Sequence, residues 1–193
     1  MSESEPDHEV DHEVDHEAVA KALALRLLTR GPRSRAQLGE AMARKDVPED
    51  VAQAVLDRFT EVGLIDDAEY ARMLVRARLE DRGLARRALR VELRRKGIDD
   101  EVASMALRAV DEDLEETTAR ELARRRLAGS RGLAREVRMR RAVAMLGRKG
   151  YSSGLAVKIV CELLAAEGPS AAGEPNDDTE AADMQASGYF GDD

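Results

Sequence analysis

Tryptophan is missing from the sequence, and tyrosine and phenylalanine are so rare that aromatic residues make up 3% of the chain. β-Sheets draw on aromatic and β-branched residues, whereas the Ala, Leu, Arg and Glu that dominate here favour helices. The composition therefore predicts an all-α fold. No apolar run is long enough to span a bilayer, and the acidic N-terminus is unlike a secretory signal. We therefore expect a cytoplasmic protein that does not associate with membranes.

Cysteine and histidine are also scarce, which limits metal binding and redox chemistry. The single cysteine, Cys161, excludes a disulfide framework within the chain, and its apolar surroundings predict a buried small side chain. Every histidine lies in the segment DHEVDHEVDHEA (7–18), as His8, His12 and His16. On a helix these could bind zinc or nickel weakly, but no cysteine and no buried orienting groups accompany them. We expect an acidic tail there, and no metal or other cofactor.

Positive charge is absent from both ends of the chain. Residues 1–17 contain eight acidic residues and residues 168–193 contain seven, and neither segment has a Lys or Arg. The intervening residues 18–167 contain 31 basic and 24 acidic residues, a net charge of +7. The acidic ends are poor in apolar residues, which predicts disordered tails. The basic body is typical of a protein that meets a polyanion or an acidic partner.

Three segments of the body resemble one another: MARKDVPEDVAQAVL (42–56), LRRKGIDDEVASMAL (93–107) and LGRKGYSSGLAVKIV (146–160). Each joins an Arg-Lys pair to a turn and an apolar-periodic helix, and each has room for two helices before it. The start and stop signals predict nine helices. Their expected ranges are 18–30, 34–45, 48–62, 67–82, 84–96, 99–113, 116–128, 134–149 and 152–167.

These helices predict three tandem three-helix repeats, at 18–67, 68–115 and 116–167, which stack into an elongated curved array between tails at 1–17 and 168–193. Asp46 departs from the pattern, because the other two turns have Gly97 and Gly150 at this position. Asp adopts left-handed backbone less readily than Gly, so we expect the first turn to differ in shape. Asp66 or Asp67 is expected to cap the helix that opens the second repeat.

Arginine and lysine of the second and third repeats form candidate binding faces. Helical periodicity places Arg86, Arg87, Arg90 and Arg94 within about 100° of arc. On the helix expected at 134–149, Arg135, Arg138, Arg141 and Lys149 form a similar stripe, and Met139, Val143 and Leu146 mark the core side. Between 72 and 96 ten basic residues oppose three acidic ones, and between 120 and 149 eleven oppose two. Such uncompensated charge favours phosphate or carboxylate binding over a merely solvated face. The candidate residues are Arg86, Arg87, Arg90, Arg94, Arg95, Lys96, Arg124, Arg125, Arg135, Arg138, Arg141 and Lys149.

Features of an enzyme are missing from the body, which has no glycine-rich phosphate loop, no Cys/His ligand set and no histidine base. Carboxylate pairs such as Asp66-Asp67 and Asp99-Asp100 stand at predicted helix starts, where capping accounts for them. We therefore expect no catalytic residues and no enzymatic activity.

The string GLIDDAEYA (63–71), the recurring Arg-Lys-Gly, and ALRLL (24–28) together resemble the RecX family of regulatory proteins. The resemblance covers roughly 18–167. It implies three tandem three-helix repeats and a monomer that lies in the groove of the RecA filament on single-stranded DNA. Such a protein would restrain filament growth, ATP hydrolysis, strand exchange and co-protease activity, in homologous recombination, DNA repair and the SOS response. Weak direct DNA binding is a further expectation.

A DNA-binding transcription regulator is the alternative, because residues 34–67 superficially resemble a winged-helix reader. A winged helix would continue after Gly63 into a β-hairpin, whereas AEYARMLVRARLEDR (68–82) is helical in pattern. A helical scaffold that binds only protein, with solvated arginine faces, is a third possibility.

Overall fold

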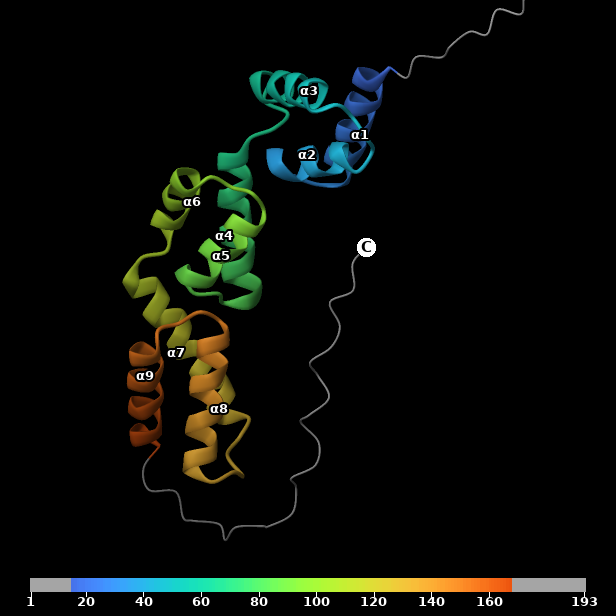
Figure 1. The fold of residues 1–193 in the computed structure, drawn as a ribbon. Coiled ribbons are helices and arrows are strands. Elements are labelled where there is room, and N and C mark those ends of the chain that lie inside the picture. Colours follow the sequence, from blue (N-terminus) through green and yellow to red (C-terminus); the bar gives the residue numbers. More distant parts are fainter. Residues whose placement is uncertain (1–14, 168–193) are drawn as a thin grey trace, which may run out of the picture. The chain divides into compact units, whose positions relative to one another are not determined.

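The computed structural model describes residues 15–167, which contain nine α-helices, one short 3-10 helix and no strand (Figure 1). The helices are α1 (His16–Arg30), α2 (Arg35–Ala43), α3 (Glu49–Glu61), α4 (Asp67–Arg82), α5 (Arg86–Arg95), α6 (Asp100–Ala106), α7 (Glu112–Ala128), α8 (Arg135–Arg148) and α9 (Ser153–Ala166). The prediction of an all-α fold is confirmed.

The predicted tails fall almost wholly at 1–14 and 168–193, outside the described residues, and so do His8 and His12. Within the described part, no cluster of three His, Cys, Asp or Glu side chains is arranged to hold a metal ion. No helix among residues 15–167 combines the length and apolar character needed to cross a membrane.

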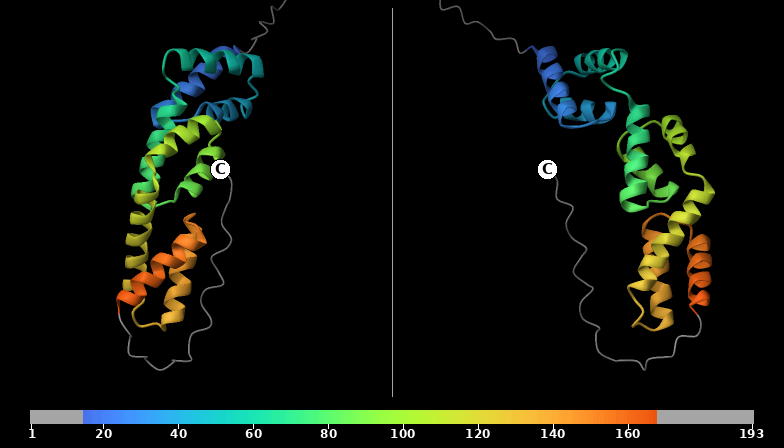
Figure 2. Two further views of the ribbon diagram at one scale, coloured as in Figure 1. Left: turned by 90° about the vertical axis from the view of Figure 1, so that its left-hand side faces the viewer. Right: turned by 180° about the vertical axis from the view of Figure 1, so that it is seen from behind.

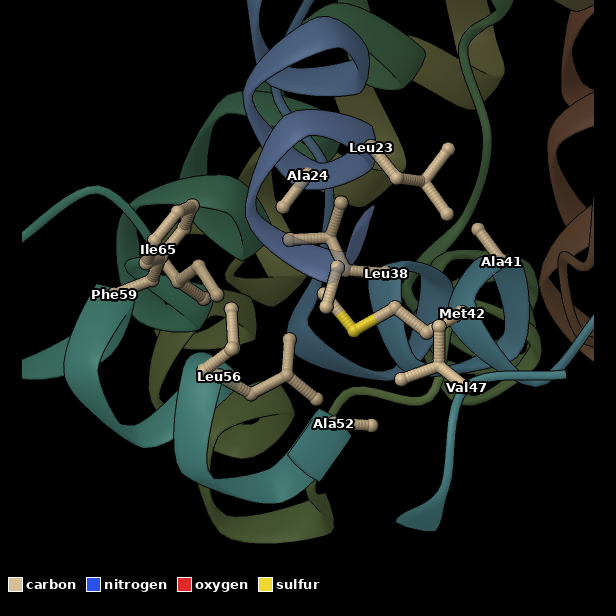
Figure 3. Close-up of a cluster of buried hydrophobic side chains, with 12 residues drawn as sticks. Leu23, Ala24, Leu38, Ala41, Met42, Val47, Ala52, Leu56, Phe59 and Ile65 are labelled. Atoms are coloured by element: carbon tan, nitrogen blue, oxygen red, sulfur yellow. The ribbon is translucent and has the colours of Figure 1, made fainter. Parts of the chain in front are cut away.

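The described residues form two compact units. The first comprises residues 15–117 together with 149–151, and the second comprises 118–148 and 152–167. In the first unit α1, α2 and α3 pack on one another around a core that includes Leu38, Met42, Leu56 and Phe59 (Figure 3). Helices α4, α5 and α6 surround a second core. In the second unit α8 and α9 lie side by side (Figure 2).

Side-chain caps fix several helix starts where the sequence predicts them. Ser34 and Gln37 form a capping box at α2, because the Ser34 side chain accepts from Gln37 N while the Gln37 side chain accepts from Ser34 N. Asp66 accepts from Glu69 N at 2.8 Å and caps α4, as predicted for this aspartate pair. Ser152 accepts from Leu155 N and caps α9.

The helices predicted at 99–113 and 116–128 were wrong at the boundary they face. Helix α6 ends at Ala106, a 3-10 turn follows over Leu107–Ala109, and α7 begins at Glu112. The cause is Asp111, whose side chain accepts from Leu114 N at 2.8 Å. This cap starts a new helix in the middle of the acidic stretch that sequence periodicity assigned to the previous one.

Asp46 adopts the same left-handed backbone as its two glycine counterparts, so the expected difference at this position was wrong. Asp46 adopts a positive φ of 56°, beside 70° at Gly97 and 93° at Gly150. Asp tolerates this region better than most residues with a Cβ, and its side chain is exposed.

Cys161 is exposed, which corrects the expectation of a buried side chain. On α9 the buried positions are Ala156, Ile159, Val160 and Leu164, and their spacing of three and four residues defines one side of the helix. Cys161 lies about 100° from Val160 around the axis, away from that side. An apolar run within a helix therefore does not bury all its members.

Candidate functional site

The N-terminus of α2 is completed by residues from the next three-helix segment. Asp67 accepts a hydrogen bond from Arg35 N at 2.8 Å, and Lys96 O accepts one from Ser34 Oγ at 2.5 Å. Both acceptors carry negative or partial negative charge, which suits the positive end of the helix dipole. The start of α2 is therefore satisfied by side chain and backbone from the segment containing α4 to α6.

The N-terminus of α5 is completed in a similar way. Its cap residue, Ala85, has no side-chain oxygen, but Glu115 accepts from Arg86 N at 3.2 Å and Lys149 O accepts from Ala85 N at 2.9 Å. Lys149 Nζ also donates to Arg82 O. Lys149–Tyr151 belongs to the first unit, so this candidate binding residue has a structural role there.

Glycine allows the two Arg-Lys-Gly turns to approach these helices. A Cβ at Gly97 would overlap the Cβ of Ala36 on α2, and a Cβ at Gly150 would lie 2.7 Å from Ala88 Cβ and 2.8 Å from Ala88 N on α5. Nothing precedes α1–α3 among the described helices for the Asp46 turn to pack against in this way. The glycine at the second and third turns is thus required for close approach as well as for positive φ.

Tyr151 fixes the same turn from the other side. Its side chain is buried, and its hydroxyl donates to Gly83 O at 3.0 Å. Burial raises the pKa of the hydroxyl well above its ordinary value, since the charged form is disfavoured away from water. The donor therefore stays protonated at any physiological pH.

The predicted stripe on α5 is a solvent-facing surface of the first unit. Arg87, Arg90 and Arg94 are exposed, and the buried side of the helix is formed by Leu89 and Leu93. Arg86 and Lys96 are half-buried, and Arg95 is exposed. Arg94 lies 3.0 Å from Asp100, but both side chains are largely exposed, so this pair contributes little to stability. We define the α5 stripe as Arg87, Arg90 and Arg94.

The predicted stripe on α8 does not form a free surface. Arg138 is buried, donates to Leu127 O at 3.2 Å and pairs with Glu167 at 2.6 Å. Arg135 is exposed, but its Nη1 donates to Leu164 O at 2.9 Å. Both guanidinium groups hold carbonyl groups at helix C-terminal ends, where cations are favoured. Arg138 therefore leaves the candidate binding surface.

Two arginines that the sequence reasoning missed, Arg140 and Arg148, lie with the predicted Arg141 on the outer side of α8. Its buried positions are Arg138, Ala142 and Leu146, and the opposite side of the helix presents Arg140, Arg141 and Arg148, all exposed. Among residues 15–167 no acidic side chain pairs with these three. We call Arg140, Arg141 and Arg148 the outer α8 face. If Ala142 and Leu146 had been taken as the core side of this helix, helical periodicity would have predicted the outer α8 face from the sequence.

The excess positive charge lies entirely in the second unit. Its described residues contain eleven basic and four acidic residues, a net charge of +7, whereas the first unit has 20 basic and 22 acidic residues, a net charge of −2. On α7 of the second unit, Arg124 and Arg125 are exposed, and Arg125 lies 3.3 Å from Glu121. The second unit is therefore the stronger candidate for binding a polyanion.

Comparison with known proteins shows the family to which this chain is related. A family model described as the first three-helix domain of RecX matches residues 20–59, and one described as the second three-helix domain matches 66–107. A regulatory protein RecX from Thermobifida fusca is 54% identical over 144 residues, which cover 75% of this chain and 78% of the relative. This chain belongs to the RecX family. The regulatory protein RecX of Streptomyces coelicolor is 49% identical over 144 residues, covering 75% of this chain and 77% of the relative.

Solved RecX structures share the fold. The crystal structure of RecX from Lactobacillus salivarius has a TM-score of 0.69 at 23% identity, and covers 77% of this chain and 97% of that chain. A second crystal structure, of a regulatory protein RecX, has a TM-score of 0.67 at 24% identity, covering 77% of this chain and 72% of that chain.

The residues that resemble the RecX signature have structural roles in this RecX chain. Asp66 caps α4, and Asp67 caps α2. Tyr70 is half-buried, and burial raises its pKa. These side chains therefore maintain helix ends and packing in this chain.

Proposed function

We propose that this protein binds the RecA filament on single-stranded DNA and inhibits filament growth, ATP hydrolysis, strand exchange and co-protease activity. Its setting would be DNA repair and the SOS response, in the cytoplasm. The observation that carries the proposal is membership of the RecX family at 54% identity over most of the chain. The exposed arginines provide a physical basis for this binding, because guanidinium groups pair with the phosphates of DNA and with the carboxylates of an acidic protein groove.

Two surfaces are candidates for the contact. The outer α8 face belongs to the strongly basic second unit, whereas the α5 stripe belongs to a unit whose charge is nearly balanced. Long-range attraction to a polyanion depends on the local excess of charge. We therefore assign the larger share of binding to the outer α8 face, and a smaller share to the α5 stripe.

The test is RecA-catalysed, DNA-dependent ATP hydrolysis and strand exchange, measured with and without substoichiometric protein. Reversal to Glu of Arg140, Arg141 and Arg148 should weaken inhibition about a hundredfold or more, and reversal of Arg87, Arg90 and Arg94 should weaken it less. A matched control reverses Arg26, Arg30 and Arg44, which are also exposed arginines, in the first three-helix segment.

Full inhibition by both reversed variants would exclude these surfaces. An unmutated protein that leaves RecA unaffected but binds one duplex sequence tightly would instead support the transcription-regulator reading.

A further inference from the structure

The charge of residues 168–193 mirrors that of the unit to which they are attached. They contain seven acidic residues and no basic one, and the described residues of the second unit have a net charge of +7. Five of the acids, Glu174, Asp177, Asp178, Glu180 and Asp183, fall within ten residues. The basic second unit is thus followed in the same chain by a segment with an equal and opposite charge.

The starting point of this segment is fixed next to α8. Arg135 Nη1 donates to Leu164 O at 2.9 Å, and Arg138 Nη2 lies 2.6 Å from Glu167 Oε2. Both contacts hold the C-terminal turn of α9 against the N-terminal part of α8. Residues 168 onward therefore leave the described structure beside the helix that carries Arg140, Arg141 and Arg148.

The segment is long enough to cover the helix. An extended chain advances about 3.3 Å per residue, so the sixteen residues 168–183 can reach roughly 50 Å. Helix α8 has 14 residues and is about 21 Å long, with a diameter of about 10 Å. The acids can thus pass around α8 and lie along its full length.

We propose that residues 168–183 bind the outer α8 face of the same molecule and compete there with DNA or another polyanionic partner. This inference rests on the proposed function for its biological meaning, but the contact itself requires neither RecA nor DNA. Intramolecular attachment keeps the local concentration of acids high, so contacts that are individually weak can act together. Since exposed charges are screened by salt, the competition acts most strongly at low ionic strength.

Direct contact can be tested with the full chain. A spin label on Ser187→Cys, in a Cys161→Ser background, should broaden the amide signals of α8 at low salt and lose this effect in high salt. The matched control carries the label on Ser2→Cys, next to the other acidic segment, and should leave α8 unaffected. Broadening confined to other helices, or none, would overturn the proposal.

Competition is tested separately by neutralising Glu174, Asp177, Asp178, Glu180 and Asp183 to Gln or Asn. Affinity for a labelled single-stranded oligonucleotide should rise about tenfold at about 50 mM salt and by much less at about 200 mM. The control neutralises Asp7, Glu9, Asp11 and Glu13, and should change affinity less.

An affinity unchanged by neutralisation, despite spin-label contact, would overturn the competitive role. Broadening of α8 together with failure to inhibit RecA would leave the intramolecular contact standing and reject the proposed function.

Discussion

At the scale of single residues, Gly63 after α3 and Gly97 in an Arg-Lys-Gly turn illustrate two separate constraints. Gly63 has a φ of 73° with open space around the position of a Cβ, so Gly63→Ala tests backbone strain alone. We expect it to cost about 1 kcal/mol of unfolding free energy. Gly97→Ala adds overlap with Ala36 Cβ and should cost about 3 kcal/mol. Hydrogen exchange of first-unit amides measures both.

The obstructing atom decides whether a second substitution rescues the first. At Gly97 the overlap is with a side-chain methyl, so Ala36→Gly should recover about a third of the loss, because Gly itself costs about 1 kcal/mol within a helix. At Gly150 the backbone N of Ala88 also lies 2.8 Å away, so Ala88→Gly should not rescue Gly150→Ala. Equal rescue at both positions would contradict this account of the turns.

At the scale of helices, two arginines of α8 that are three residues apart are expected to have different roles, one in stability and one in binding. Arg138 is buried and pairs with Glu167, so Arg138→Ala should destabilise the second unit by about 3 kcal/mol because it removes a buried, hydrogen-bonded guanidinium group. Arg141 is exposed, so Arg141→Ala should change stability by less than about 0.5 kcal/mol. Thermal unfolding and RecA inhibition measure the two effects.

The two variants should thus show opposite defects. Arg141→Ala should weaken RecA inhibition in a protein that unfolds normally, and Arg138→Ala should lower the unfolding temperature. Loss of inhibition by Arg138→Ala at a temperature where hydrogen exchange shows an intact second unit would contradict a purely structural role for this side chain.

Helices are also the scale at which sequence reasoning was most and least informative. Ser34, Asp66 and Ser152 cap through their own neighbours, and such local signals can be read directly. The cap at Asp111 was missed, because the sequence alone does not show which of several neighbouring acidic residues precedes the new helix. Periodicity found the solvent side of α5, but on α8 the core side was misjudged, since buried Arg138 was counted as surface. Contacts such as Glu115 with Arg86 N join residues 29 apart and leave no pattern in sequence.

At the scale of the whole molecule, the first unit is not one continuous stretch of chain. It includes Lys149–Tyr151, which follow α8 and return to α5 through Ala85 N, Gly83 O and the close approach at Ala88. A fragment of residues 1–117 lacks this turn, so it loses buried Tyr151 and leaves Ala85 N without its acceptor. We expect α4–α6 in the fragment to be about 2–4 kcal/mol less stable than in the full chain.

Hydrogen exchange of α5 and α6 amides in the full chain and the fragment measures this difference. A chain that ends at residue 167 is the matched control, because it loses residues 168–193 and keeps the turn. That control should protect α5 as well as the full chain does, whereas the fragment should not. If the fragment retained full protection, Lys149–Tyr151 would contribute nothing to the stability of α4–α6. The glycine at position 150 would then be required only by the positive φ of its own turn, and not by the close approach to α5.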